Sequence, residues 1–318
     1  MKQILFVLTC FVLPGVVCAN AELGAAIDNV RASCGGISNE LNHMKTMAGI
    51  NTAVTGVGTV AGGVALGTGI AKANVDEEVS ELEEELRREI DVLNALANEQ
   101  DGTQLVGVEI DWADLRSRDF GDANQQRDEL LQKQAQVDKL NNKSEKLGDW
   151  RTGTVAVSAA TNIAGAVIAG TNKVKGDLKG QIDECVASVK VLSNVWMQAR
   201  LSKSASDDML ARAEKIVSAC GAWENLDISS INNRSTGATI ASGIGAATGV
   251  AGTVTSAVAN SEPVRSGDAE KEKNLNTAAN VLAGGTMVAS GGATVFNATQ
   301  ISAIKRAVTV ADVCQGAL

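Results

Sequence analysis

The chain has 318 residues and a formal net charge of −9, and few of its side chains are bulky. Aromatic residues make up 3% of the chain, tyrosine is absent, and 32 glycines stand against 2 prolines. The negative charge argues against a nucleic-acid partner, because such binding depends on neutralising phosphates with Lys and Arg. Large side chains cannot fill this interior, so we expect backbones to approach one another closely.

The first 21 residues have the pattern of a secretory signal peptide. Lys2 supplies the positive start, an apolar stretch covers 4–17, and small residues precede a cleavage point after Ala21. A lipoprotein cleaved at Cys18 is a weaker alternative, because Val17 stands where Gly or Ala is expected. We therefore predict export to the periplasm, the cell envelope or the extracellular space.

The rest of the chain contains one pattern twice. A Cys-Gly pair precedes a segment rich in Gly, Ala, Thr and Val, which is followed by a charged insert, a second such segment and an Asp-x-Cys motif. The pattern indicates an internal duplication, with units at 22–185 and 220–318 joined by connecting helices at 186–219. The four small-residue segments are residues 52–75, 152–174, 236–259 and 277–299.

These four segments are predicted to be closely packed helices. The expected fold is therefore all-α, with two unequal antiparallel helical hairpins. Strands are the alternative, because Gly, Val and Thr are weak or middling helix formers. Abundant Ala, the lack of Pro and the neighbouring charged helices favour the helix. Small residues spaced four apart form a smooth stripe on a helix, which lets a neighbour approach. The predicted packing residues are Gly58, Gly62, Gly63, Gly67, Gly237, Ala241, Gly245 and Gly249.

The insert at 76–149 is predicted to extend the first hairpin as a charged coiled-coil tip. It carries 21 acidic and 9 basic residues, a net of −12, so we expect an acidic recognition surface. The second unit has only a short turn at 261–273 in the same place. The predicted zipper residues, near heptad spacing, are Val79, Leu82, Leu86, Leu93, Val137 and Leu140. The basic residues expected at the opposite end are Lys45, Lys173, Lys175, Arg234, Lys305 and Arg306.

Four cysteines remain once the signal peptide is removed, and an exported protein can oxidise them. Four cysteines allow three pairings, and free thiols are a further alternative. The duplicated layout favours one disulfide per unit, Cys34 with Cys185 and Cys220 with Cys314. No spacing typical of a zinc site occurs among cysteine and histidine.

Little in the sequence points to catalysis. His43 is the one histidine, and it is expected to be a partly buried side chain rather than a general base. No metal site, cofactor or enzymatic activity is predicted. An acidic cluster could bind calcium, but its spacing is not that of an EF-hand, and a solvated acidic surface is the preferred interpretation. That cluster consists of Asp111, Asp114, Asp119 and Asp122.

Two functions from different classes fit these features. The preferred one is a structural or interaction protein of the cell envelope or exterior, with the acidic tip binding a protein partner or a second copy. The alternative is a membrane-active protein whose small-residue helices enter a bilayer, as their length and small-xxx-small spacing allow. Their many Gly and Thr residues and the charged insert count against insertion.

Overall fold

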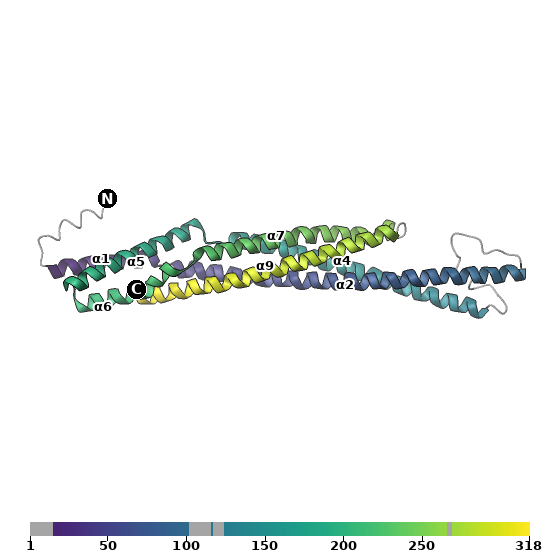
Figure 1. Ribbon diagram of the computed structural model, residues 1–318, viewed down its shortest axis with the longest axis horizontal. Helices are drawn as coiled ribbons and strands as arrows, with labels where there is room; N and C mark the ends of the chain where they lie inside the picture. Colours follow the sequence, from purple (N-terminus) through teal and green to yellow (C-terminus); the bar gives the residue numbers. More distant parts are fainter. Residues whose placement is uncertain (1–14, 102–115, 117–123, 266–268) are drawn as a thin grey trace. The chain divides into compact units, whose positions relative to one another are not determined.

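The computed structural model describes residues 15–101, 116, 124–265 and 269–318 (Figure 1). Within these ranges no residue is in a strand, so the fold is all-α and the strand alternative is wrong. The described elements are α1 (Gly15–Cys34), α2 (Ile37–Asp101), α4 (Asn124–Thr171), α5 (Gly176–Ser202), α6 (Asp207–Cys220), the 3-10 helix η3 (Gly221–Asn225), α7 (Ile228–Ala259), α8 (Glu262–Arg265) and α9 (Ala269–Ala317).

Local sequence accounts for several helix ends. Gly36 has a φ of 90°, a conformation that favours glycine, and it lets the chain leave α1 and begin α2. The connecting helices α5 and α6 are separated at 203–206, where Lys203 adopts a left-handed φ of 52°. Asp227 caps α7, because its Oδ1 accepts hydrogen bonds from the Ser229 hydroxyl (2.5 Å) and the Ser230 amide (3.2 Å).

The long helices pass through two compact units. Unit 1 consists of Met1–Gly56, Asn162–Gly243 and Gly291–Leu318, and unit 2 of Val57–Thr161 and Ile244–Ser290. Each predicted hairpin contributes to both units. As predicted, α2 runs from the first small-residue segment into the charged insert without a break.

Unit 1 has a core of large apolar side chains, which we call the disulfide-linked core. It is formed by α1, α5, α6 and η3 with the start of α2 and the end of α9, and both disulfides lie in it. Leu23, Ile27 and Leu192 are at most 2% exposed, and Trp223 is 3% exposed. Such burial contributes roughly 25 cal/mol per Å² of apolar area removed from water.

Unit 2 is held together differently. Parts of α2, α4, α7 and α9 lie side by side, and one cluster of buried apolar residues contains only Ala65, Val155 and Ala283. Helix backbones approach closely: a Cβ built on Gly249 would lie 2.8 Å from the Ala159 Cβ. A second cluster joins the charged parts of α2 and α4.

The buried positions follow one spacing in all four long helices. They alternate three and four residues apart, the spacing of a coiled-coil seam, yet small and polar residues occupy most of them. In α7 the buried positions are Ile231, Ser235, Ala238, Ser242, Gly245, Gly249, Gly252, Ser256 and Ala259.

This spacing corrects part of the predicted stripe. Gly58, Gly62, Gly245 and Gly249 are buried, as close packing requires. The prediction for Gly67 is wrong, because this residue is exposed and a Cβ there would meet nothing within 4 Å. The remaining three are half-buried at the margin of the seam: Gly63, Gly237 and Ala241.

Candidate functional site: an apolar surface around a polar core

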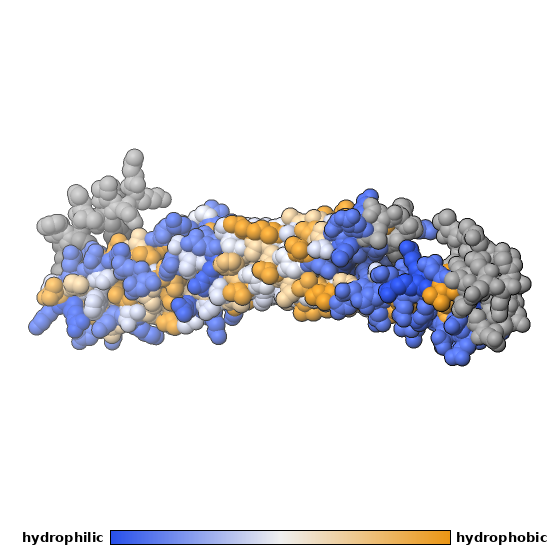
Figure 2. All heavy atoms as spheres, turned by 45° about the vertical axis from the view of Figure 1, so that its right-hand side comes forward, coloured by the Kyte–Doolittle hydropathy of each residue, from blue (hydrophilic) through white to orange (hydrophobic). Residues whose placement is uncertain are grey.

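The small-residue segments expose their large apolar side chains. In α2, Val60 is 68% exposed, and in α9, Val281 and Val288 are 70% and 75% exposed. Figure 2 shows apolar side chains gathered on the surface. The exposed apolar residues of these segments in unit 2 are Val57, Val60, Val64, Ile70, Val157, Ile244, Val250, Val254, Val258, Val281, Met287 and Val288. Those in or beside these segments in unit 1 are Ile50, Ile163, Val167, Ile240, Val295 and Phe296.

The interior of unit 2 contains two buried cations. The Lys72 ammonium, 1% exposed, donates to the Asp76 carboxylate (2.6 Å) and to the Glu272 carboxylate (3.0 Å). This arrangement joins α2 to α9 through a charge that would be costly to bury alone.

Arg151 is the second buried cation of unit 2. Its guanidinium is completely buried and donates to the side-chain oxygens of Asn276 (2.6 Å), Ser256 (2.8 Å) and Asn280 (3.4 Å). One side chain of α4 is thereby bonded to α7 and α9. The polar residues at these positions replace the apolar side chains that usually hold a helical bundle together.

The interior of unit 1 continues the same pattern where the small-residue segments enter it. The Asn51 side chain donates to the Asn297 Oδ1 at 2.9 Å, and both residues are buried. Ser235 donates to the Ala169 carbonyl at 2.6 Å. In both units, therefore, these polar groups face inward and most Val and Ile side chains of the segments face outward, although Val75, Val155 and Val174 are buried.

Threonine hydroxyls in these segments are bonded to their own helices. The hydroxyls of Thr68, Thr161 and Thr248 each donate to the carbonyl four residues earlier, at 2.9, 3.1 and 2.9 Å. Such back-bonding satisfies the hydroxyl without water. The outer surface of the segments thus exposes methyl groups without requiring an aqueous hydrogen-bond partner for these donors.

Two stretches contain helix that is long and apolar enough to cross a membrane, Ala19–Val92 and Asn124–Ser202. The first includes the turn between α1 and α2, and the second includes the break between α4 and α5. Their most apolar windows are only 28% and 33% buried. The core helix of a water-soluble protein would instead bury such a window. Trp150, at the start of the apolar stretch of α4, is 67% exposed.

The predicted basic end lies where hydrogen bonds join four chain segments within unit 1. The Asn172 side chain donates to the Met44 carbonyl (3.0 Å), and Gln300 donates to the Asn172 carbonyl (2.9 Å). The Val174 amide donates to the Asn232 side chain (2.7 Å). These bonds bring the neighbourhoods of Lys45, Lys173, Lys175, Arg234, Lys305 and Arg306 to one region of the unit.

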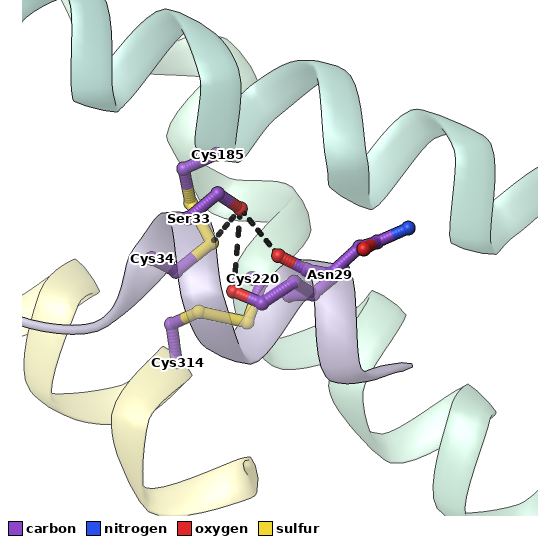
Figure 3. Close-up of a disulfide and its surroundings, with 7 residues drawn as sticks. Asn29, Ser33, Cys34, Cys185, Cys220 and Cys314 are labelled. Carbon is purple, nitrogen blue, oxygen red and sulfur yellow. Dashed lines mark hydrogen bonds between the residues drawn. A yellow bond between two sulfur atoms is a disulfide. The ribbon is translucent and has the colours of Figure 1, made fainter. Parts of the chain in front are cut away.

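The cysteine pairs are those that the duplicated layout favours. Cys34 is bonded to Cys185 and Cys220 to Cys314, and Figure 3 shows the two disulfides beside each other. The sulfur atoms of Cys34, Cys185 and Cys314 lie within 4.8 Å of one another. Among the described residues this is the one grouping with metal-ligand geometry, and its sulfurs are already in disulfides.

The charged parts of α2 and α4 pack through the predicted apolar residues. Val79, Leu86 and Val137 are buried, and Leu82 and Leu140 are half-buried against them. Leu93 lies outside the residues whose side chains the structure describes.

A charged contact accompanies this apolar cluster. Lys133 of α4 donates to Glu85 of α2 (2.8 Å) and to Glu89. These hydrogen bonds lower the pKa of Glu85 and raise the pKa of Lys133.

The remaining candidate sites offer little chemistry. His43 is exposed on α2, so the expectation of a partly buried side chain is wrong. The acidic cluster at Asp111, Asp114, Asp119 and Asp122 lies outside the described residues.

The chain was compared with known proteins. No protein-family model matches it, and neither a curated protein nor a solved structure is significantly similar to it.

The sequence analysis missed the residues that define the polar interior. Lys72, Arg151 and Asn51 are not among the packing residues that the sequence predicts. The available signal was their place in the alternating three- and four-residue spacing, which a search for apolar periodicity does not detect.

Proposed function

We propose that the protein is an exported, non-enzymatic, membrane-active protein whose small-residue helices enter a lipid bilayer. The observation that carries the proposal is the inverted polarity of these helices, with most Val and Ile side chains outside and Asn, Ser, Lys and Arg inside. Large contiguous apolar surfaces are uncommon on proteins that stay in water, and they mark interaction sites. This proposal reverses the order drawn from the sequence, in which a structural or interaction protein is preferred and a membrane-active protein is the alternative.

A bilayer accounts for the interior as well as the surface. In lipid, helices associate through small residues at close range and through side-chain hydrogen bonds between helices. Ionisable residues of membrane segments face the bundle interior and find partners there, as Lys72 and Arg151 do. The self-bonded threonines leave few donors that lipid could not satisfy.

The length of the apolar surface along single helices also matches the thickness of a bilayer. Exposed apolar residues extend from Ile50 to Ile70 in α2 and from Ile240 to Val258 in α7. At 1.5 Å per residue these stretches are about 30 and 27 Å long. The hydrocarbon core of a bilayer is about 30 Å thick. Trp150 is placed as an interfacial tryptophan would be.

Two finer features of the fold belong to the same proposal. We infer that the chain arose by duplication, because each disulfide joins the beginning of one predicted hairpin to its end. We also infer that the charged parts of α2 and α4 form a coiled-coil arm, which the buried contacts of Leu86 with its neighbours support.

Flotation with phosphatidylcholine liposomes tests membrane entry. The purified mature protein should rise with the vesicles and resist extraction by carbonate. Val60→Lys with Val288→Lys places two charges on the apolar surface, each costing about 3 kcal/mol at a bilayer centre. We expect the bound fraction to fall by about a hundredfold or more.

Leu201→Lys is the matched control, because Leu201 is 81% exposed but lies in α5, outside the small-residue segments. It should leave flotation unchanged. A wild-type protein that stays in the aqueous fraction would overturn the proposal, as would a double variant that floats normally.

A second candidate function is recognition by the acidic arm, either of a protein partner or of a second copy. The net charge of −12 at 76–149 favours it. Glu81, Glu83 and Glu84 are exposed there, and changing them to Lys should alter salt-dependent self-association measured by sedimentation velocity. If the sedimentation of the variant matches that of the wild type at low and at high salt, the hypothesis of self-association through the arm is wrong.

A further inference from the structure

We infer that the basic residues of unit 1 bind the headgroups of anionic phospholipids, so that the protein prefers negatively charged membranes. We call the six residues the basic collar: Lys45, Lys173, Lys175, Arg234, Lys305 and Arg306. This inference rests on the proposed membrane entry and adds the lipid class that the protein selects.

The collar residues come from four distant stretches that the fold brings together. Hydrogen bonds join Asn172 to Met44 and to Gln300, and Val174 to Asn232. The Arg234 guanidinium also donates to the Thr299 carbonyl. Chain positions near 44, 173, 233 and 300 are thus held together by bonds that do not involve the charges of the lysines.

No acidic residue interrupts this positive region along the chain. Asp and Glu are absent from residues 41–75, 150–176, 228–261 and 273–311. Within the part of the chain that the structure describes, none of the six collar residues forms an ion pair. Lys175, Lys305 and Arg306 are exposed, and the other three are half-buried. The collar is therefore able to accept anions from outside.

The collar lies one to two helical turns beyond the apolar surface of the same unit. Lys45 precedes the exposed Ile50 by five residues, and Arg234 precedes the exposed Ile240 by six. These separations correspond to roughly 8 and 9 Å along a helix. The polar zone of a bilayer leaflet is of similar depth, and the aliphatic stems of Lys and Arg can reach into it.

The combination of exposed Val, Ile and Phe side chains with the exposed cations Lys175, Lys305 and Arg306 selects an amphipathic anion. A phospholipid offers acyl chains to the apolar residues and a phosphate to the collar. Basic residues at an anionic membrane surface strengthen binding additively, and salt weakens their effect.

Vesicle partition measures this preference on the intact mature protein. Vesicles of phosphatidylcholine alone are compared with vesicles containing about 30% phosphatidylglycerol, at roughly 0.1 M and 0.5 M salt. We expect at least about tenfold stronger partition into the anionic vesicles at the lower salt, with most of the gain lost at the higher.

A collar variant with Lys173, Lys175, Lys305 and Arg306 changed to Gln should lose this gain while still entering neutral vesicles. The matched control changes Lys179, Lys203, Arg212 and Lys215 to Gln, which removes the same charge from exposed sites elsewhere in unit 1. Thermal melting of both variants verifies folding.

Each outcome decides one point. Loss of the anionic gain in the collar variant alone supports the inference. Equal partition of the wild type into both vesicle types overturns it and leaves membrane entry standing. Equal loss in both variants also overturns it, because net charge would then suffice. Partition into neither vesicle type overturns the proposed function itself.

Discussion

The disulfide-linked core and the small-residue segments bury opposite kinds of side chain. Around the disulfides, Leu23, Ile27 and Trp223 are inside, as the hydrophobic effect requires in water. In the small-residue segments, Ala65 and Asn297 are buried while Val288 is 75% exposed. One part of the chain therefore buries its large apolar side chains, and the other part exposes them. The first pattern is the one expected of a protein in water, and the membrane entry that we propose accounts for the second.

Removing a disulfide should have the largest effect on stability and should act on the first region alone. Cys34→Ser with Cys185→Ser frees a link between residues 151 apart in sequence. Because the unfolded chain gains freedom, we expect a loss of roughly 2–5 kcal/mol in urea denaturation. Flotation with liposomes should persist under native conditions. Unchanged unfolding, or abolished flotation of a folded variant, would contradict the prediction that this disulfide stabilises the first region alone.

Lys72→Met should come next, because it tests the polar interior. The substitution leaves the Asp76 and Glu272 carboxylates without their cation, at a cost of about 3 kcal/mol in the free energy of unfolding. Adding Glu272→Gln should recover part of the loss, measured as a double-mutant cycle. A neutral or stabilising Lys72→Met would mean that the buried charge does not hold α2 and α9 together.

Two glycine substitutions compare a closely packed position with an open one in unit 2. Gly249→Ala should destabilise by roughly 2 kcal/mol, since its Cβ would meet the Ala159 backbone at 2.9 Å. Gly67→Ala should instead stabilise by about 0.5–1 kcal/mol, because its surroundings are open and Ala favours a helix. Thermal melting of the two variants gives the signs. Equal shifts would show that the seam does not depend on close approach.

The charged parts of α2 and α4 should respond weakly to pH. The lowered pKa of Glu85 stabilises the folded state above the carboxyl's unfolded value, and this contribution disappears as pH falls through the folded pKa. The raised pKa of Lys133 contributes below its unfolded value and is lost as pH rises through the folded pKa. Helicity followed by circular dichroism should therefore decline slightly at both extremes. Glu85→Gln should reduce the acid dependence, whereas an unchanged acid profile would contradict this account.

Much of the helical architecture was predictable because its signals are local. The Cys-Gly and Asp-x-Cys motifs anticipated both cysteine pairs, and the heptad spacing anticipated the contacts of Val79, Leu86 and Val137. The close-packing stripe was predicted only in part. Gly67 fits the four-residue spacing in sequence, but it lies outside the seam that α2 presents to its neighbours.

The sequence by itself determined an all-helical chain of small-residue segments, charged insert and paired cysteines, because propensity, turn residues and motif spacing act over short distances. Only the tertiary structure decided which face of each segment points inward. Val and Ala are both apolar, so the sequence pattern does not show which face of a helix is buried. The buried face could carry Val, or it could carry Ala and Asn. Packing decides between the two: helices whose contacts are made by Gly and Ala leave little room for branched side chains between them. Most Val and Ile side chains are therefore directed outward, although Val155 is buried.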